Sequence, residues 1–533
     1  MANTTRLALT HTMQTELGRV CYMPSRHTTI ISAELADAQG KDLCALVLLS
    51  VLVYGPSHFG HLYGEQDTAR LVIDALAWLK ANVRDYSLSE YRYYTSPGYI
   101  WLIKELYPFA ERSQLPIAFW LNTINWVCAL AFPIPTYLLF RGLLGRLPAV
   151  LGVVLLCVTP AFWLAGLYGF PSLPSLFLMV VALLIFDRYL AGSLRGPRIA
   201  HCLMVALCLL GATLLKADVW LSCVAMLGIA AVRRQTSWIR LAEIVVLAVC
   251  PAIVSLLISR ALLADSPTSA DYLESWNVQY RPWLSGSLLR PVIKVCFSMG
   301  VASSLIFGVC VTRLLRRREF RLLFFLASWA ILPIAFWVFR PGDSPRHHLP
   351  ATVPIALALG WFLAEFRTRR WVPVLMVAAL ILGNYFALPP SPSTLRPSGR
   401  LFESAEMIRQ RVSRYHQAAR EYAGSRVPRK VILGSFTNPY FDAEVLTSAQ
   451  SVISVKRGQY LGYDAIEIVH TEGARTFVST SVRLSPNQIR DAAATFSRSG
   501  YRVFSFEYEV GGAAVPNLPQ IQKLSGFRPG EYP

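Results

Sequence analysis

The chain has 533 residues, of which 54% are hydrophobic and only 16% are charged, and its mean hydropathy is +0.41. A soluble chain of this length would form about two to four domains with a larger charged fraction, so the composition indicates a protein that lies mostly in lipid. The formal net charge of +19 does not indicate nucleic-acid binding, because basic cytoplasmic loops of a membrane protein account for most of such a surplus.

The N-terminal segment, residues 1–41, is polar and lacks the pattern of a secretory signal peptide. Residues 42–58 form the first apolar stretch near the roughly 20 residues that cross a bilayer. We therefore expect an uncleaved signal-anchor whose N-terminus is cytoplasmic.

A long loop, residues 59–115, follows this first span. The stretch "HLYGEQDTARL" places the carboxylates of Glu65 and Asp67 just before a helical pattern that contains Leu71 and Trp78. A second stretch, "SPGYIWLIKELYPF", begins with a proline suited to the first turn of a helix. Both patterns predict amphipathic helices that lie in the outer membrane interface.

Apolar segments then recur along the chain, and about eleven reach the length needed for a span. The predicted spans are 42–58, 116–140, 146–166, 171–191, 199–216, 218–232, 238–263, 292–315, 320–340, 346–366 and 371–388. The fifth and sixth are short enough to be one broken helix.

The distribution of basic residues predicts the orientation of these spans. With a cytoplasmic N-terminus, sixteen arginines fall in the short inner loops and five Lys or Arg residues in the short outer loops. An odd number of spans then places everything after residue 389 on the exterior face.

Three of the outer cations are Lys216 in "LLKADVW" and Arg340 and Arg346 in "FRPGDSPRHHLP". Charges beside hydrocarbon are costly, up to about 2.5–3.5 kcal/mol each at mid-bilayer, so such residues usually have partners or a function. Cations together with one or two carboxylates suit an anionic ligand that lies beside a base.

A Pro/Ser-rich linker, residues 389–400, separates the spans at 42–388 from a soluble region at 401–533. Strand-like and helical patterns alternate in this region, which predicts a small exterior α/β domain large enough to bury its own core. It has no Gly-rich phosphate loop, so we expect it either to contact the acceptor or a partner or to act as a structural cap.

No pattern predicts a metal site or a cofactor. The ten cysteines show no CxxC spacing, and the adjacent His347 and His348 would point about 100° apart on a helix. A divalent cation is therefore disfavoured.

Taken in order along the chain, these motifs resemble the GT-C glycosyltransferases, most closely the branch of the protein O-mannosyltransferases and the aminoarabinose transferases of lipid A. The resemblance covers residues 42–388 and rests on the acidic first exterior loop, "SPGYIWLIKEL", "LLKADVW" and "RHHLPATVPIALALG". It implies an α-helical polytopic membrane protein of the cell envelope, in the bacterial inner membrane. It also implies that a sugar is transferred, with inversion, from a polyprenyl-phosphate carrier to a hydroxyl of a glycan, lipid or protein on the periplasmic or exterior face.

The resemblance also implies roles for single residues. Asp67 matches the exterior-loop carboxylate of the family and would deprotonate the acceptor. Lys216 and Arg346 match basic residues that would bind the phosphate, with Arg340 near enough in sequence to assist. The other expected substrate contacts are Glu65, His347, Tyr94 and Tyr99. The pattern departs from the family at His347 and His348, where members often have an aromatic residue, and at the fourth span, which lacks a common carboxylate.

Each role competes with a structural interpretation. Asp67 could simply cap a helix, worth about 1 kcal/mol, and Lys216 could extend to the interface or pair with Asp218. The competing function is a transporter or flippase of a lipid-linked or anionic solute. It is disfavoured because the charges gather at one face and no internal repeat is visible. An oligosaccharyltransferase is disfavoured because the tail lacks a "WWD" signature.

Overall fold

The computed structural model describes residues 26–54, 66–82, 97–113, 117–167, 171–194, 196–262, 296, 299–338, 348–366, 371–386, 417–425, 427–433, 439–449, 451–470, 475–479, 486–505 and 522–523. In parts of some helices, including residues 66–70, it describes the backbone alone.

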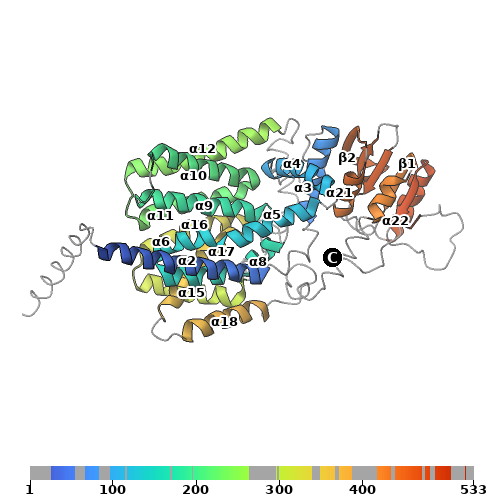
Figure 1. The fold of residues 1–533 in the computed structure, drawn as a ribbon. Helices are drawn as coiled ribbons and strands as arrows, with labels where there is room; N and C mark the ends of the chain where they lie inside the picture. The colour runs from blue at the N-terminus through green and yellow to red at the C-terminus, as the bar shows by residue number, and fades with distance from the viewer. Residues whose placement is uncertain are drawn as a thin grey trace, which may run out of the picture.

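Most of the described chain forms a bundle of helices, and two further helices and a sheet lie at one end of it (Figure 1). The bundle helices are α2 (Arg26–Tyr54), α5 (Ile117–Ala131), α6 (Pro133–Leu144), α7 (Arg146–Cys157), α8 (Pro160–Leu167), α9 (Ser172–Leu190), α10 (Arg198–Leu215), the 3₁₀-helix η2 (Ala217–Val224), α11 (Ala225–Val232), α12 (Trp238–Leu262), α15 (Val301–Arg316), α16 (Phe320–Val338), α17 (Leu349–Ala364) and α18 (Trp371–Phe386).

Helices lie in all eleven segments that the sequence predicts as spans, and proline breaks two of them. The second segment divides into α5 and α6 at Pro133, and the third divides into α7 and α8 before Pro160, because proline lacks the N–H that continues a helix. Among the described residues, four helical stretches are long and apolar enough to cross a membrane: Phe119–Leu144, Ser172–Leu190, Arg198–Leu215 and Trp238–Ser259.

The fifth and sixth predicted spans are two separate segments. Arg198 at the start of α10 and Arg233 just after α11 pair with Glu243 and Asp187, and both pairs lie near the C-terminal end of α9. The chain therefore leaves this end of the bundle through α10 and returns to it through η2 and α11. The two segments run antiparallel and are not one broken helix.

Backbone contact between α7 and α17 marks the closest packing of the bundle. A Cβ atom added at Gly360 would lie 2.4 Å from the carbonyl oxygen of Pro148 and 2.5 Å from the backbone nitrogen of Gly152. Small residues allow helices to approach in this way where lipid supplies little hydrophobic driving force.

Helices α3 (Gln66–Ala81) and α4 (Pro97–Ser113) lie between the bundle and the sheet (Figure 1). The prediction that both are amphipathic interfacial helices is wrong for α3, because every residue from Leu71 to Trp78 is buried within the protein. Helix α4 keeps exposed apolar side chains, Trp101 and Phe109 among them.

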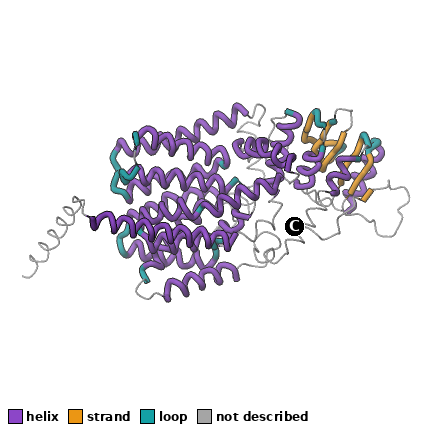
Figure 2. The backbone as a smooth tube through the Cα atoms, viewed as in Figure 1, coloured by secondary structure: helices purple, strands orange, loops and turns teal. Residues whose placement is uncertain are grey.

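The sheet has six strands in the order β2-β3-β4-β1-β5-β6 and mixes parallel and antiparallel pairs. Its strands are drawn in orange in Figure 2. Strand β1 pairs in parallel with β4 and β5, whereas β3 is antiparallel to β2 and β4. The elements are β1 (Arg429–Leu433), α21 (Pro439–Ser448), β2 (Ser454–Tyr460), β3 (Tyr463–Val469), β4 (Arg475–Ser479), α22 (Pro486–Arg498), β5 (Arg502–Ser505) and β6 (Gln522–Lys523).

Different elements pack on the two faces of the sheet. Helix α22 packs on one face, against Val431 and Val503. The other face joins α21, residues 417–425 and helices α3 and α4 in a single apolar cluster, which we call the shared core. Its members include Leu71, Leu76, Trp78, Tyr99, Ile100, Ile103, Tyr422, Ile432, Leu446, Ile466, Ile468 and Phe504.

Candidate functional site

Three of the predicted site residues fall in the described part of the chain. Lys216 and Tyr99 are described with their side chains, and Asp67 is described by its backbone, as the second residue of α3. The remaining predicted residues lie outside the described residues: Glu65, Tyr94, Arg340, Arg346 and His347.

Lys216 occupies the turn between α10 and η2. Its backbone is extended, with φ −157° and ψ 110°, and this ends α10. The side chain is buried, at 5% exposure, and its Nζ lies 3.3 Å from Oδ2 of Asp218. Lys216 thus lies within the protein and does not extend over its surface. The eight-residue 3₁₀-helix that follows is longer than the usual run.

The N-terminus of α4 packs directly against the chain that leads into this turn. A Cβ atom added at Gly98 would lie 2.9 Å from Cβ of Leu214 and 3.0 Å from its carbonyl carbon and oxygen. The next residue, Leu215, packs against the shared core. The motifs "SPGY" and "LLK", which are far apart in sequence, therefore meet at one place.

Two cation–π contacts join α3 and α4. Trp78 of α3 contacts Lys104 of α4, with Nζ 4.4 Å from the ring centroid, and Lys80 contacts Tyr107 further along both helices at 5.5 Å. The N-terminal turn of α4 is the one at which Gly98 meets Leu214, beside the Lys216 turn.

Tyr99 is a core residue in this structure. Its side chain is completely buried in the shared core, and burial raises the pKa of its hydroxyl. A sugar would reach the ring only if α4 moved, so a contact between Tyr99 and substrate stays a prediction.

Asp74 is a carboxylate that the sequence pattern did not single out. It lies seven residues after Asp67, on the same side of α3, and is 2% exposed. The signal was present, since an acid interrupts the apolar run "LVIDALAW".

His348 precedes α17 as its N-cap residue and is 3% exposed. Helix α17 runs from this histidine to Glu365, which pairs with Arg313 and Arg317 at the opposite end of the bundle. The "RHHLP" motif thus leads into the bundle at the end that carries the Lys216 turn.

The opposite end carries most of the described ion pairs. Its carboxylates are the buried Asp187 and the half-buried Asp42, Glu243 and Glu365, and each binds one or two arginines that the sequence assigns to inner loops. Arg233, for example, donates to both oxygens of Asp187 at 2.7 and 2.8 Å and to the carbonyl of Gly142.

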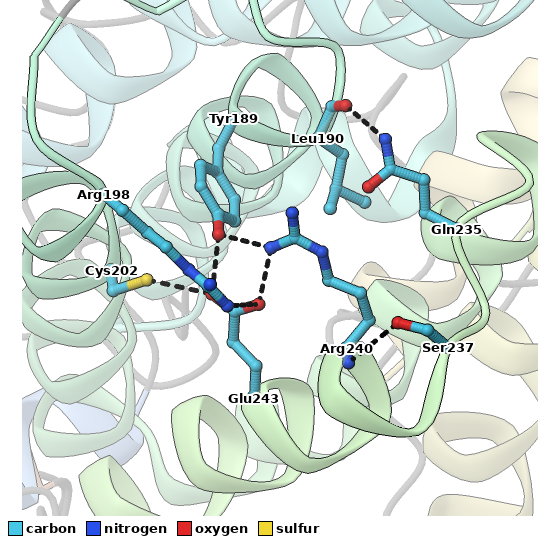
Figure 3. A network of polar contacts seen from close by, with 8 residues as sticks. All are labelled: Tyr189, Leu190, Arg198, Cys202, Gln235, Ser237, Arg240 and Glu243. Carbon is cyan, nitrogen blue, oxygen red and sulfur yellow. Dashed lines mark hydrogen bonds and ion pairs between the residues drawn. The ribbon is translucent and has the colours of Figure 1, made fainter.

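Figure 3 shows the densest of these networks, which gathers around Glu243 of α12. The carboxylate accepts hydrogen bonds from the Tyr189 hydroxyl at 2.9 Å, from Arg198 at 2.9 Å, from Arg240 at 2.7 Å and from the Cys202 thiol at 3.1 Å. Arg240 also donates to the Tyr189 hydroxyl. The network joins α9, α10 and α12 and is satisfied internally, which indicates a structural role.

Within the described residues, no three His, Cys, Asp or Glu side chains gather closely enough to hold a metal ion. Lys216 is a buried cation beside the carboxylate of Asp218, and a cation in such a place suits the binding of an anion.

Comparison with solved structures places this arrangement among known folds. The chain resembles ArnT from Cupriavidus metallidurans bound to undecaprenyl phosphate, with a TM-score of 0.53 and 14% identity over 77% of this chain and 85% of that one. The apo state of the same protein gives 0.46 and 16% identity, over 73% of this chain and 70% of that one.

The oligosaccharyltransferase of Archaeoglobus fulgidus in its apo form gives a TM-score of 0.44 and 14% identity over 77% of this chain. This chain covers 64% of its length. No protein-family model and no curated protein matches the sequence.

The likeness to ArnT is one of fold. It covers 77% of this chain and agrees with the four long apolar helices among the described residues. The protein is thus an integral membrane protein with the GT-C fold, as the sequence motifs predict.

Proposed function

We propose that this protein is a glycosyltransferase that moves a sugar from a polyprenyl-phosphate carrier to an acceptor hydroxyl on the exterior face of the membrane. Its GT-C fold supports the proposal, because ArnT, which shares the fold, binds undecaprenyl phosphate. The acceptor belongs to a glycan, a lipid or a protein.

One observation carries the proposal. The N-terminal turn of α4 meets the buried Lys216 turn at Gly98, and from the direction in which the contacts between α3 and α4 advance we infer that the N-terminal turn of α3 lies at the same end. Helix N-termini carry partial positive charge and unpaired N–H groups, which favour an anion. Two such termini beside a buried ammonium group suit a lipid phosphate, and Asp67 supplies an acid in the same N-terminal turn.

In the proposed reaction, the carboxylate of Asp67 takes the proton of the acceptor hydroxyl. The acceptor oxygen then bonds to the anomeric carbon from the face opposite the phosphate. The bond between that carbon and the phosphate oxygen breaks, and the carrier phosphate leaves with the electron pair. General-base catalysis of this kind is worth roughly 10²–10⁴-fold in rate.

Lys216 would stabilise the charge that develops on the leaving phosphate, assisted by Arg346 and Arg340. In the structure its ammonium group pairs with Asp218. An incoming phosphate would share or displace this carboxylate, so the affinity for the donor should depend on Asp218 as well as on Lys216. Glu65, His347 and Tyr94 complete the proposed substrate contacts.

The decisive test is turnover of a radiolabelled polyprenyl-phosphate sugar by the purified protein. We expect release of free carrier phosphate when acceptor is present, and we expect Asp67→Asn to abolish that release while the protein stays folded. Asp491→Asn is the matched control, because it makes the same change on the exposed face of α22. Wild-type turnover by Asp67→Asn would remove Asp67 as the base. Passage of intact lipid-linked sugar across vesicles without free carrier phosphate would instead indicate a transporter.

We further propose the eleven-span topology, with a cytoplasmic N-terminus, an exterior domain at 401–533 and insertion in the bacterial inner membrane. The arginine-bound carboxylates gather at one end of the bundle, which supports the positive-inside assignment of that end. Reporter fusions after residue 389 should report the exterior, and a cytoplasmic signal would contradict the topology and the placement of the site.

A further inference from the structure

Lys80, near the C-terminal end of α3, caps a helix of the C-terminal domain. Its Nζ donates hydrogen bonds to the carbonyl oxygens of Leu446, Thr447 and Ala449, each at 2.8 Å. These carbonyls belong to the last turn of α21 and the residue beyond it, where a helix leaves its C=O groups without intrahelical donors. One ammonium group therefore uses all three of its protons on a helix that follows more than three hundred residues later.

The surroundings of Lys80 support this contact. Burial lowers the pKa of Lys80 to about 8, and Glu111 acts in the opposite direction, so the side chain is charged at neutral pH. Tyr107 of α4 lies against it, and the Tyr107 hydroxyl donates to the Thr447 carbonyl at 3.3 Å. The positive charge also complements the negative end of the α21 dipole.

The hydrogen bonds of Lys80 fix the register between α3 and α21, which the apolar contacts of the shared core do not fix alone. Apolar contacts between α3 and the sheet are non-directional, so they hold the two parts together without fixing how far one slides along the other. Hydrogen bonds depend steeply on distance and angle. Three of them from one side chain fix the register between α3 and α21.

The same helix carries the proposed base at its other end. Residues 67 and 80 of α3 are about 20 Å apart at 1.5 Å per residue. The eight residues from Leu71 to Trp78, which lie between these two positions, are all buried within the protein. We infer that a shift at Lys80 is passed along α3 to its N-terminal turn.

We propose that Lys80 is a positioning residue. It ties α21 of the C-terminal domain to α3 and thereby sets where Asp67 lies relative to the Lys216 turn. The inference rests on the proposed function for the role of Asp67, but the hydrogen bonds between Lys80 and α21 do not depend on it. The C-terminal domain is then part of the catalytic machinery although it supplies no reacting group.

The kinetic test compares Lys80→Met, which keeps the aliphatic length, with Lys80→Arg, which keeps the charge and the donors. We expect Lys80→Met to lower kcat by roughly 10- to 100-fold with the KM for donor unchanged, since small misplacements of a reacting group have such effects. Lys80→Arg should recover most of the rate. Lys456→Met is the control, because Lys456 is exposed on β2.

A second measurement is independent of activity. Amide hydrogen exchange of the full-length protein should become faster in Lys80→Met along α3 as far as residues 66–70, as well as at the end of α21. Tyr107→Phe removes only the weaker bond to Thr447 and should change exchange in the same direction by less. Wild-type kcat in Lys80→Met, or faster exchange confined to the end of α21, would overturn the proposal. A wild-type protein without transferase activity would refute the proposed function. The exchange measurement would still test whether Lys80 couples α21 to the N-terminal turn of α3.

Discussion

Gly98 is the residue through which α4 reaches the chain that leads into the Lys216 turn, and its lack of a side chain permits the contact. We predict that Gly98→Ala lowers kcat by roughly 10-fold or more, because the added methyl group would lie 2.9 Å from Cβ of Leu214 and 3.0 Å from its backbone. The backbone of α10 cannot yield as a flexible side chain would, so α4 must shift.

Single-turnover kinetics with a lipid-linked donor would measure this effect. Gly308→Ala is the matched control, since a Cβ atom at this helical glycine meets nothing within 4 Å. Equal rates in both variants would show that the contact between α4 and Leu214 does not affect the chemistry.

Single residues differ in how far the sequence reveals them. Lys216 stands out because a lysine between two apolar segments is costly to place, and the structure finds it buried beside Asp218. Asp74 is hidden by the helical pattern around it, and the burial of α3 on all sides depends on the sheet, which lies hundreds of residues away. The local sequence pattern reveals a charged residue that lies between apolar segments. It cannot reveal which face of a helix a distant part of the chain will bury.

At the scale of elements, the network around Glu243 is the main polar contact among α9, α10 and α12. We predict that Glu243→Ala destabilises the protein by about 3 kcal/mol, near the lower end of the range for breaking a buried ion pair, since it leaves two arginines without a counter-charge. The side chain of Glu243 is 10% exposed, whereas that of Arg198 is 54% exposed. Arg198→Ala should therefore cost no more than about 1 kcal/mol.

Thermal unfolding in detergent would compare the two variants. The expected result is a clearly lower transition temperature for Glu243→Ala than for Arg198→Ala, with transferase activity per folded molecule retained in both. Equal losses would mean that the exposed pair with Arg198 contributes as much as the buried bonds.

The helical bundle itself could largely be predicted, because a run of apolar residues is a strong signal. The limits of the elements were harder to predict. Helix α2 begins at Arg26, well before the predicted span at residue 42, and the divisions at Pro133 and Pro160 leave four helices where the sequence predicts two. A proline signals a break, but packing decides whether the helix bends or ends.

At the scale of the whole molecule, the membrane part and the C-terminal domain share one core. The sequence predicts that residues 401–533 are numerous enough to bury their own core. In the structure one face of the sheet packs instead in the shared core, where Ile432, Ile466 and Ile468 join the cluster that includes Leu76 of α3. The composition of residues 401–533 carries no information on which elements cover the sheet.

This shared core leads to a prediction about the isolated domain. We predict that residues 401–533, expressed alone, do not form a stable native fold, because the sheet face that α3 and α4 cover becomes exposed, and the capping ammonium group of Lys80 is lost from α21. Losing one face of an apolar core removes stabilisation of roughly 25 cal/mol per Å² uncovered. That loss can exceed the few kcal/mol by which a small domain is stable.

The comparison is between the isolated domain and the same strands in the full-length protein. Amide exchange in β1 and β3 should be slow in the full chain and fast in the fragment, and the fragment should bind an apolar dye and unfold without a cooperative transition. Adding helix α3 back, as a fusion of residues 66–81 through a flexible linker, should restore part of the protection, and Lys80→Met in that fusion should restore less. If the fragment unfolds cooperatively without α3, the sheet folds without any contact from the membrane part. The contact between α3 and the sheet would then join two domains that fold independently.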